Sequence, residues 1–189
     1  MRTGLTPLLR VVLIGPECTG KTWLAQDLAE RYQVPWSPEF ARRFVDEHPR
    51  PVTFADVEAI GTGQLDGERR AAAAARRRKA RLVIHDTDLV STMVYSRHYY
   101  GDCPRWIEEE AVRRLGGLYL LHHVDVEWVA DGRQREQPER REELFERFRA
   151  TLAGLGARVA DIVGPWDERR RLAVRAVDAR LGGGGLAGR

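Results

Sequence analysis

Residues 15–22 constrain the fold of this chain more than any other stretch. They read Gly-Pro-Glu-Cys-Thr-Gly-Lys-Thr, which has the G-x-x-x-x-G-K-T spacing of a phosphate-binding loop. Glycines allow such a backbone to curl, so that successive N–H groups point inward at phosphate oxygens. A lysine and a threonine at the end of the motif supply charge to the phosphates and a hydroxyl to Mg²⁺. The predicted nucleotide-binding residues are Gly15, Glu17, Cys18, Thr19, Gly20, Lys21 and Thr22.

The sequence on both sides of this loop has the pattern that the motif requires. Residues 8–14 form a short apolar run, which is typical of a buried parallel strand. Leu24 and Leu28 follow the loop four residues apart, which predicts one face of a helix. Strand, loop and helix therefore stand in the required order. The lysine content also supports a phosphate-binding loop, because Lys21 is one of only two lysines in a chain that otherwise uses arginine.

The composition is that of an ordinary globular chain. Of its 189 residues, 43% are hydrophobic and 31% are charged, which suits a single domain that we place at residues 1–181. We expect the glycine-rich residues 182–189 to be a disordered tail. The formal charge of +3 comes from 31 basic and 28 acidic residues, and this near balance argues against a nucleic-acid partner.

Cysteine content and hydropathy bear on the compartment. Cys18 and Cys103 are too few for a disulfide framework, which predicts a reduced, cytoplasmic protein. No apolar run approaches the roughly 20 residues of a membrane span, and the N-terminus lacks a signal-peptide core. We therefore expect no membrane partner.

Short apolar segments alternate with helical patterns along the chain. Predicted strands lie at residues 8–14, 34–38, 82–86, 117–123 and 157–163. Predicted helices cover residues 23–32, 39–44, 54–80, 91–100, 105–115, a segment beginning at 138, and 167–181. This alternation predicts an α/β fold with a five-stranded parallel sheet flanked by helices.

The predicted strand at residues 82–86 ends in Asp86, and Asp88 follows two positions later. An aspartate at the end of such a strand is the expected Mg²⁺-side partner of a phosphate-binding loop. Because strand side chains alternate, Asp86 and Asp88 face the same side if the strand continues that far. Asp86 is then the metal-side residue, and Asp88 faces the phosphate acceptor. The alternative is that one of them only caps the following helix.

Residues 131–141 are rich in arginine and have no apolar core content. Between two packed elements, such a segment suits a lid that closes over the transferring phosphoryl group, with Arg133 and Arg135 contacting phosphate. The alternative is a solvated run of charges that pair with one another.

Two aromatic groups are interpreted as structural. Tyr95, Tyr99 and Tyr100 are expected to pack rather than to form a ligand platform. His122 and His123 resemble a metal-binding pair, but adjacent residues of a strand face opposite sides, so we expect both to be structural.

Four of these stretches, taken in order, resemble one family. They are residues 15–22, the Glu-Phe-Ala-Arg of residues 39–42, the His-Asp-Thr-Asp of residues 85–88, and the arginine-rich segment. From about residue 10 to residue 181 the chain resembles the nicotinamide riboside kinase domain of the NadR type, an AAA-type ATPase domain. The resemblance implies a P-loop kinase fold that uses ATP and Mg²⁺ to phosphorylate the 5′-hydroxyl of nicotinamide riboside.

The chain differs from the family at two points. Bifunctional members carry an adenylyltransferase domain upstream, whereas few residues precede the first strand here, so only the kinase step is expected. Members often have tryptophan directly before the glutamate that matches Glu39, whereas here Pro38 stands there and Trp36 lies two residues earlier.

Motifs and resemblance together assign a role to each candidate residue. The predicted catalytic residues are Lys21, Glu39, Asp88 and Arg135, and the predicted metal-side residues are Thr22 and Asp86. Arg133 is expected to bind the nucleotide. The predicted substrate-binding residues are Trp36, Glu39, Arg42 and Asp88, with Trp36 facing the cationic pyridinium ring of a small nucleoside-type substrate. Two alternatives stay open, a kinase for another nucleoside or nucleotide and a regulatory ATP- or GTP-binding switch. The sequence predicts neither the donor base nor the oligomeric state.

Overall fold

In a computed structural model, which describes residues 7–126 and 140–182, the strands form one parallel sheet. The order of the strands is β2-β3-β1-β4-β5, and every neighbouring pair is parallel. The strands are β1 Leu9–Ile14, β2 Trp36–Ser37, β3 Leu82–Asp86, β4 Leu118–His122 and β5 Val159–Ile162. The predicted α/β class and five-stranded parallel sheet are therefore confirmed.

Helices follow the strands closely in sequence. They are α1 Lys21–Tyr32, α2 Phe40–Glu47, α3 Val57–Arg77, α4 Leu89–Tyr100, α5 Arg105–Arg113, α6 Arg141–Gly154 and α7 Trp166–Gly182. A short 3₁₀ turn, η1 Phe54–Asp56, precedes α3. The predicted lid residues Arg133 and Arg135 lie outside the described residues, as do residues 183–189 of the predicted tail.

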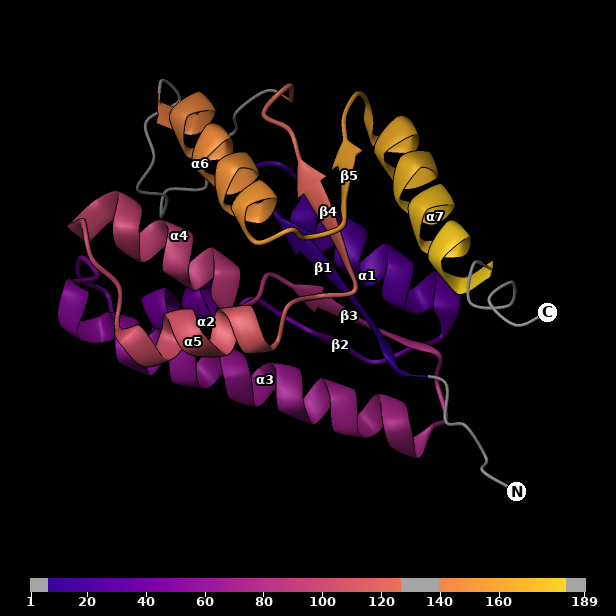
Figure 1. Ribbon diagram of the computed structural model, residues 1–189, viewed down its shortest axis with the longest axis horizontal. Coiled ribbons are helices and arrows are strands. Elements are labelled where there is room, and N and C mark those ends of the chain that lie inside the picture. The colour runs from indigo at the N-terminus through magenta and orange to yellow at the C-terminus, as the bar shows by residue number, and fades with distance from the viewer. Residues whose placement is uncertain (1–6, 127–139, 183–189) are drawn as a thin grey trace.

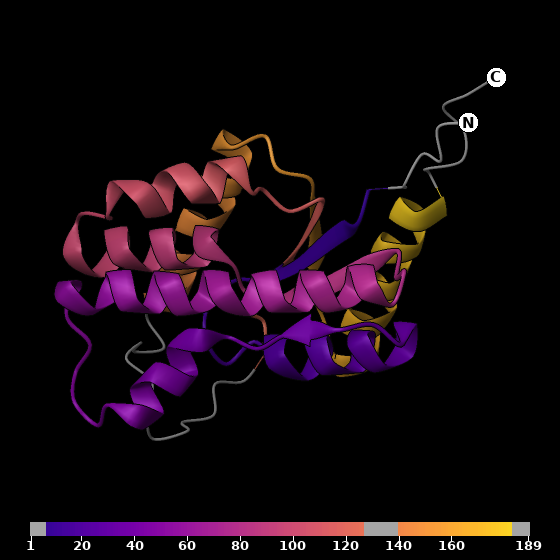
Figure 2. The same ribbon diagram turned by 90° about the horizontal axis from the view of Figure 1, so that it is seen from below.

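The sheet is covered on both faces. Helices α1 and α7 lie on one face, and α3, α4, α5 and α6 lie on the other (Figures 1 and 2). Alternation along β1 divides the core between the two faces, because Val11 and Leu13 pack toward α1 and α7 while Val12 and Ile14 pack toward α4 and α6. Both sides of this central strand are fully buried, which explains its continuous apolar sequence.

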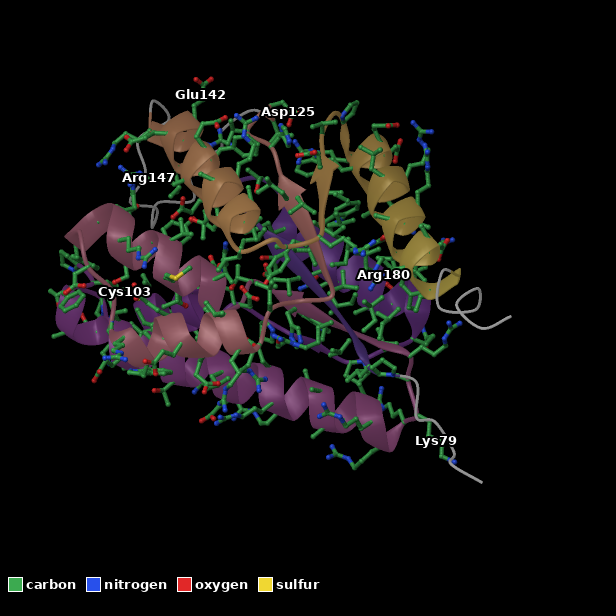
Figure 3. All side chains as sticks on the ribbon, viewed as in Figure 1. Lys79, Cys103, Asp125, Glu142, Arg147 and Arg180 are labelled. Carbon is green, nitrogen blue, oxygen red and sulfur yellow. The ribbon has the colours of Figure 1, made fainter. Side chains whose placement is uncertain are left out.

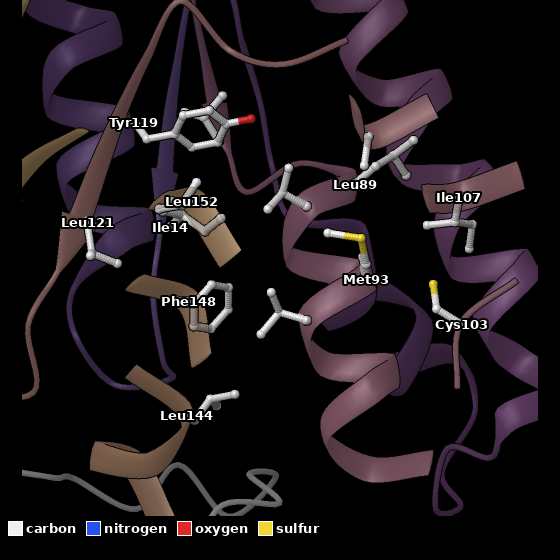
Figure 4. Packing of buried hydrophobic residues seen from close by; sticks show 14 of the residues in the cluster. Ile14, Leu89, Met93, Cys103, Ile107, Tyr119, Leu121, Leu144, Phe148 and Leu152 are labelled. Atoms are coloured by element: carbon white, nitrogen blue, oxygen red, sulfur yellow. The ribbon is translucent and has the colours of Figure 1, made fainter. Parts of the chain in front are cut away.

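The core on the α4 and α6 side is packed by large apolar side chains from several helices. Figure 4 shows Phe148 and Leu152 of α6 opposite Met93 of α4, with Ile107 of α5 further out. This layer packs α4 against α5 and α6, over the side chains of β1 and β4.

Two glycines allow neighbouring elements to approach α3. A Cβ atom at Gly63 would lie 2.3 Å from the ring of Phe40 in α2, and one at Gly61 would lie 2.7 Å from Ile107 Cδ1 in α5. Glycine lowers helix propensity, but α3 runs unbroken through both positions. The close packing that glycine permits therefore compensates for its low propensity.

Within the described ranges, none of the helices has the length and apolar content of a membrane span.

Truncation of Phe148 tests the α6 side of the core. Phe148 is fully buried, so Phe148→Ala leaves a cavity among Tyr95 and the side chains of the cluster, and we expect a loss of about 3–5 kcal/mol in the free energy of unfolding. Urea titration followed by circular dichroism measures it. Val112→Ala, at a residue that is 56% exposed, is the control and should change stability by less than about 0.5 kcal/mol. Equal losses in the two variants would contradict this account of the core.

Candidate functional site

The loop between β1 and α1 has the curled backbone of a phosphate nest. Gly15, Cys18 and Gly20 have φ angles of 134°, 53° and 79°, which are left-handed or otherwise unusual values. Glycine is needed at two of these positions for space as well, because a Cβ at Gly15 would lie 2.7 Å from the His122 carbonyl oxygen. A Cβ at Gly20 would lie 2.2 Å from the ring of Trp166. The loop therefore has the conformation that points backbone N–H groups at an anion, directly before the N-terminus of α1.

Side chains from distant elements hold the carbonyl groups of this loop. The Thr19 carbonyl accepts hydrogen bonds from His122 Nδ1 at 2.9 Å and from Arg169 Nη1 at 3.4 Å. Burial lowers the pKa of His122 to about 3, so the ring is neutral and its proton lies on Nδ1. Arg141 Nη2 donates to the Cys18 carbonyl at 3.5 Å. His122 is thus structural, as expected, and it supports the loop.

Arg169 is a fully buried arginine whose importance the sequence did not indicate. Its guanidinium also donates to the Gly164 and His123 carbonyls and pairs with Asp125. Asp125 follows β4 at the edge where the strands end (Figure 3). Arg169 therefore joins α7, the end of β4 and the phosphate loop into one unit.

Lys21 and Thr22 lie where the motif predicts. Lys21 Nζ donates to the Pro16 carbonyl at 2.6 Å, which leaves two of its three donor positions for phosphate. Thr22 Oγ1 donates to Asp86 Oδ2 at 2.6 Å across the gap between α1 and β3. The other carboxylate oxygen, Asp86 Oδ1, is buried and has no hydrogen-bond partner among the described residues.

This pair fits a magnesium ion of the P-loop type. Mg²⁺ prefers oxygen ligands, keeps several waters, and takes few protein ligands beside substrate phosphates. The Thr22 hydroxyl and the unpartnered oxygen of Asp86 match that requirement. In residues 7–126 and 140–182, no cluster of three or more acidic, histidine or cysteine side chains could hold a metal ion.

Glu39 lies beside this pair at the start of α2. Its side chain makes no capping hydrogen bond, although Glu39 precedes the first residue of the helix. Burial, together with the nearby charge of Asp86, raises the pKa of Glu39 to about 7, against the opposing effect of Lys21. A carboxylate with that pKa can take up a proton near neutral pH.

A cavity of about 320 Å³ opens next to Glu39. Its walls come from the phosphate loop, α2, α3 and α4. Polar and aromatic residues that line it are Glu17, Glu39, Arg42, Asp46, Gln64, Thr87, Ser91, Thr92, Tyr95, Ser96, Tyr99 and Tyr100. This volume is at the lower end of the range for small-molecule sites, and a nucleoside is of that size class.

Three tyrosines form the aromatic wall of the cavity. Tyr95 and Tyr99 are stacked with ring centroids 6.1 Å apart and an interplanar angle of 11°. The Tyr95 hydroxyl hydrogen-bonds Glu17 of the phosphate loop, and burial beside Glu17 and Glu39 raises its pKa well above the ordinary value. Tyr95, Tyr99 and Tyr100 therefore pack against one another and against Phe148, and they also line the cavity. Their position on the helix that follows Asp86 brings them to this edge of the sheet.

Trp36 does not line this cavity. It belongs to β2, where it pairs with Ile84 of β3, and it packs with the core on the α1 and α7 side. Trp36 therefore packs on the other face of the sheet. The aromatic surface of the cavity comes from Tyr95 and Tyr99 instead. Arg42, by contrast, lines the cavity.

Asp88 also lies outside the cavity. Strand β3 ends at Asp86, and Thr87 has a φ of 66°, so the alternation that would place both aspartates on one side is broken. Asp88 Oδ1 accepts from the Val90 amide at 3.0 Å, and Oδ2 accepts from the Tyr119 hydroxyl at 2.7 Å. The structure thus supports the alternative that Asp88 caps α4.

Gln64 is a further residue that sequence reasoning missed. Its amide oxygen accepts from the Phe40 amide at 3.0 Å, and its amide nitrogen donates to the Thr87 carbonyl at 3.1 Å. Gln64 therefore fixes the start of α2, and with it Glu39, relative to the end of β3. A single polar residue on a helix gives no recognisable pattern in sequence.

Comparisons with known proteins agree with this geometry. The family described as AAA domain matches residues 10–169. A solved structure of a NadR protein in complex with NR is 25% identical, with a TM-score of 0.72, and the match covers 93% of this chain and 50% of that chain. A NadR protein in complex with NAD and AMP-PNP is 24% identical, with a TM-score of 0.70 and the same coverage. The chain therefore spans about half the length of these NadR structures.

Two further solved structures share the fold at lower identity. YorR from Bacillus subtilis, in complex with phosphorylated GDP, is 17% identical with a TM-score of 0.56, and the match covers 92% of this chain and 98% of that chain. A thymidylate kinase from Ehrlichia chaffeensis is 14% identical with a TM-score of 0.60, covering 92% and 99%. No curated protein matches the chain. The predicted P-loop kinase fold and the resemblance to NadR are confirmed.

The raised pKa of Glu39 predicts a pH-dependent stability. Its folded-state pKa of about 7 exceeds the unfolded value of 4.5, so stability falls as pH rises between these values, and the loss is complete above pH 7. Glu39→Gln removes an ionisable group, so without ligand we expect its Tm to exceed that of the parent at pH 8, by about 2–4 °C for each kcal/mol recovered. At pH 4.5 the Glu39→Gln variant and the parent should have nearly the same Tm.

Calorimetric scans at both pH values measure this difference. Glu30→Gln, at an exposed residue of α1, is the matched control and should melt like the parent at both. A Glu39→Gln protein that is no more stable than the parent at pH 8 would contradict the assigned pKa.

Proposed function

The chain belongs to the AAA domain family, and from this premise we propose that it transfers the γ-phosphate of ATP to the 5′-hydroxyl of nicotinamide riboside. The likeness to a NadR protein in complex with NR supports this proposal. The single observation that carries it is the cavity beside the phosphate nest, because its walls combine carboxylates with tyrosine rings.

The charge of the cavity favours a cationic ligand. Among the described residues, Glu17, Glu39 and Asp46 bring three carboxyl groups to its lining, against the one guanidinium of Arg42. Nicotinamide riboside carries a permanently positive pyridinium ring, which is attracted to carboxylates and to the faces of tyrosine rings. The stacked pair of Tyr95 and Tyr99 offers such a face. A neutral nucleoside would gain much less from these groups.

The phosphate nest and Lys21 would bind the triphosphate of the donor. Backbone N–H groups at the start of α1 and the Lys21 ammonium stabilise negative charge that develops on the phosphates during transfer. Thr22 and Asp86 would hold Mg²⁺, which when bound neutralises charge on the β- and γ-phosphates.

Glu39 is placed to take the proton of the acceptor. The hydroxyl oxygen of the acceptor bonds to the γ-phosphorus while the bond from that phosphorus to the β,γ-bridging oxygen breaks, and ADP leaves. The hydroxyl proton passes to the Glu39 carboxylate, which lies among Asp86, Lys21 and Glu17 at the boundary between cavity and nest.

Asp88 has a positioning role in this proposal. Its two hydrogen bonds fix the N-terminus of α4 against β4, and α4 carries Tyr95 and Tyr99. Asp88 therefore acts on the aromatic wall of the cavity through the helix, whereas Glu39 acts on the reacting hydroxyl.

A coupled ADP-release assay tests the choice of acceptor. With ATP and Mg²⁺ we expect nicotinamide riboside to give at least about tenfold higher kcat/KM than uridine, cytidine, adenosine or their monophosphates, because of its charge. Lys21→Ala should abolish this turnover, whereas Lys79→Ala, at the other lysine of the chain, should not. A neutral nucleoside as the best acceptor would favour a different nucleoside kinase. Nucleotide binding with no turnover for any acceptor would favour a regulatory switch.

Two isosteric variants separate the roles of the carboxylates. Glu39→Gln should lower kcat by about 10²-fold or more, since it removes the proton acceptor, and should leave the KM for ATP nearly unchanged. Asp88→Asn should mainly lower Tm and raise the KM for the acceptor, because it disturbs α4. Steady-state kinetics and thermal melts distinguish them. If Asp88→Asn lost kcat as severely as Glu39→Gln at full stability, the base would have been assigned to the wrong residue.

A further inference from the structure

The second half of α3 and the turn after it concentrate positive charge. Residues 69–81 contain six arginines, one lysine and no acidic residue, whereas the rest of the chain contains 24 basic and 28 acidic residues. The net charge of the chain, +3, is therefore positive only because of this segment. The proposed reaction gives none of these residues a role.

Four of the arginines surround one alanine on the outer surface of α3. Arg69, Arg70, Arg76 and Arg77 are exposed, and each stands three or four residues from Ala73. Residues three or four apart are neighbours on the surface of a helix, so every such neighbour of Ala73 is an arginine. The opposite side of the helix carries buried alanines that pack toward the sheet. We call these four arginines the arginine face.

Exposed arginines on three other helices are paired with acidic residues one turn away. These pairs, at 2.5–2.9 Å, are Arg105–Glu109 in α5, Arg147–Glu143 and Arg149–Glu146 in α6, and Arg171–Glu168 in α7. Arg76 and Arg77 have no acidic residue three or four positions away in the sequence. Arg69 contacts Asp66 only at 3.6 Å. The arginine face therefore carries a positive charge that its own helix does not balance, and such charge repels itself.

The dipole of α3 explains part of this charge. Cations in the last turn of a helix are stabilised by its negative end, and Arg76 and Arg77 lie in that turn. The effect falls off within one turn, whereas Arg69 and Arg70 lie about two turns earlier. The dipole therefore does not account for four arginines on one face.

We propose that the arginine face binds an acidic helix of a partner protein. Arginine presents a planar fork of N–H donors that matches a carboxylate. Arg69 and Arg76 are seven residues apart, as are Arg70 and Arg77, which is about 10.5 Å along the helix axis. Glutamates seven residues apart on a second helix repeat at the same distance, so two helices lying side by side would pair all four arginines. The small side chain of Ala73 lets the second helix approach between them.

The composition of the segment disfavours two other anionic partners. Single-stranded nucleic acid is bound by cations together with aromatic rings, and residues 69–81 contain no aromatic residue. Helices that lie on a membrane surface bury large apolar side chains in it, and the apolar residues of 69–80 are all alanine. A protein that carries carboxylates at the matching spacing fits the arginine face better.

The basic end of α3 lies away from the phosphate nest. α3 ends shortly before β3 begins, whereas the nest follows the end of β1, and β1 and β3 are parallel. The end of α3, where Figure 3 labels Lys79, is therefore at the opposite edge of the sheet from the nest (Figures 1 and 3). A partner bound there leaves the nest and the cavity open, and the inference does not depend on the proposed reaction.

Fluorescence anisotropy with a designed acidic helix tests the proposal. The probe is a labelled peptide of three heptads, each with two adjacent glutamates and five alanines, and the control ligand has lysine in place of glutamate. At about 0.05 M salt the parent should bind the glutamate peptide at least about tenfold more tightly than the lysine peptide. Binding should weaken as salt is raised to about 0.15 M, because exposed charges are screened.

Two fourfold variants with the same change in net charge locate the binding site. The first neutralises the arginine face, by Arg69→Gln, Arg70→Gln, Arg76→Gln and Arg77→Gln, and should weaken binding of the glutamate peptide by at least about tenfold. The second neutralises paired arginines, by Arg105→Gln, Arg147→Gln, Arg149→Gln and Arg171→Gln, and should bind within about twofold of the parent. Glutamine is a good helix former, so circular dichroism should show both variants folded. A third variant with lysine throughout the arginine face keeps the charge and should recover most of the binding.

The other outcomes would overturn the proposal. Equal losses in the two glutamine variants would mean that net charge alone attracts the peptide. Tighter binding of a labelled DNA duplex or of phosphatidylserine vesicles through the same four arginines would mean that the face recognises phosphate. Self-association of the parent that the first variant loses would identify a second copy as the occupant. A parent that does not bind the glutamate peptide would leave the face without the proposed partner. No nucleotide or acceptor is present, so an error in the proposed reaction does not affect these results.

Discussion

The hydrogen bonds to the Thr19 and Cys18 carbonyls are the interactions on which the rest of the site depends. A loop with left-handed residues at Cys18 and Gly20 persists only where surrounding groups hold it. His122, Arg169 and Arg141 come from β4, α7 and α6, and each donates to one of these carbonyls. The phosphate nest is therefore a product of the complete fold, and the arginines that hold it are buried far from the motif in sequence.

A second constraint is the crowding of like charges around Lys21. Glu39 and Asp86 share one small region with Glu17, and burial raises the pKa of both Glu39 and Asp86. Such an arrangement lowers the stability of a ligand-free protein, and it is common at sites that bind cations or move protons. A metal ion at Asp86 and a cationic ring in the adjoining cavity would each reduce this repulsion between carboxylates. The carboxyl groups of Glu17, Glu39 and Asp86 thus connect the phosphate nest with the adjoining cavity.

Two helices divide the functions of the site. α1 starts at the nest and carries Lys21 and Thr22, which we assign to the phosphate donor. α4 starts at Asp88 and carries Tyr95 and Tyr99, which line the cavity that we assign to the acceptor. Their N-termini follow the neighbouring strands β1 and β3, which pair in parallel, so the two sides meet at one edge of the sheet.

The sequence by itself determined the elements whose information is local. The glycine loop, Lys21, Thr22 and Asp86 are recognisable because their chemistry requires fixed spacing, and the parallel strands are recognisable because burial on both faces makes them continuously apolar. The tertiary structure alone decided which aromatic and acidic side chains line the cavity. Thr87 turns the backbone after β3, so Asp88 caps a helix although it stands two residues from Asp86. Trp36 lies on the opposite face of the sheet from Tyr95, although it is closer to Glu39 in sequence. Orientation at the end of a strand depends on a single dihedral angle and on packing between distant elements, and neither leaves a periodic pattern in the sequence.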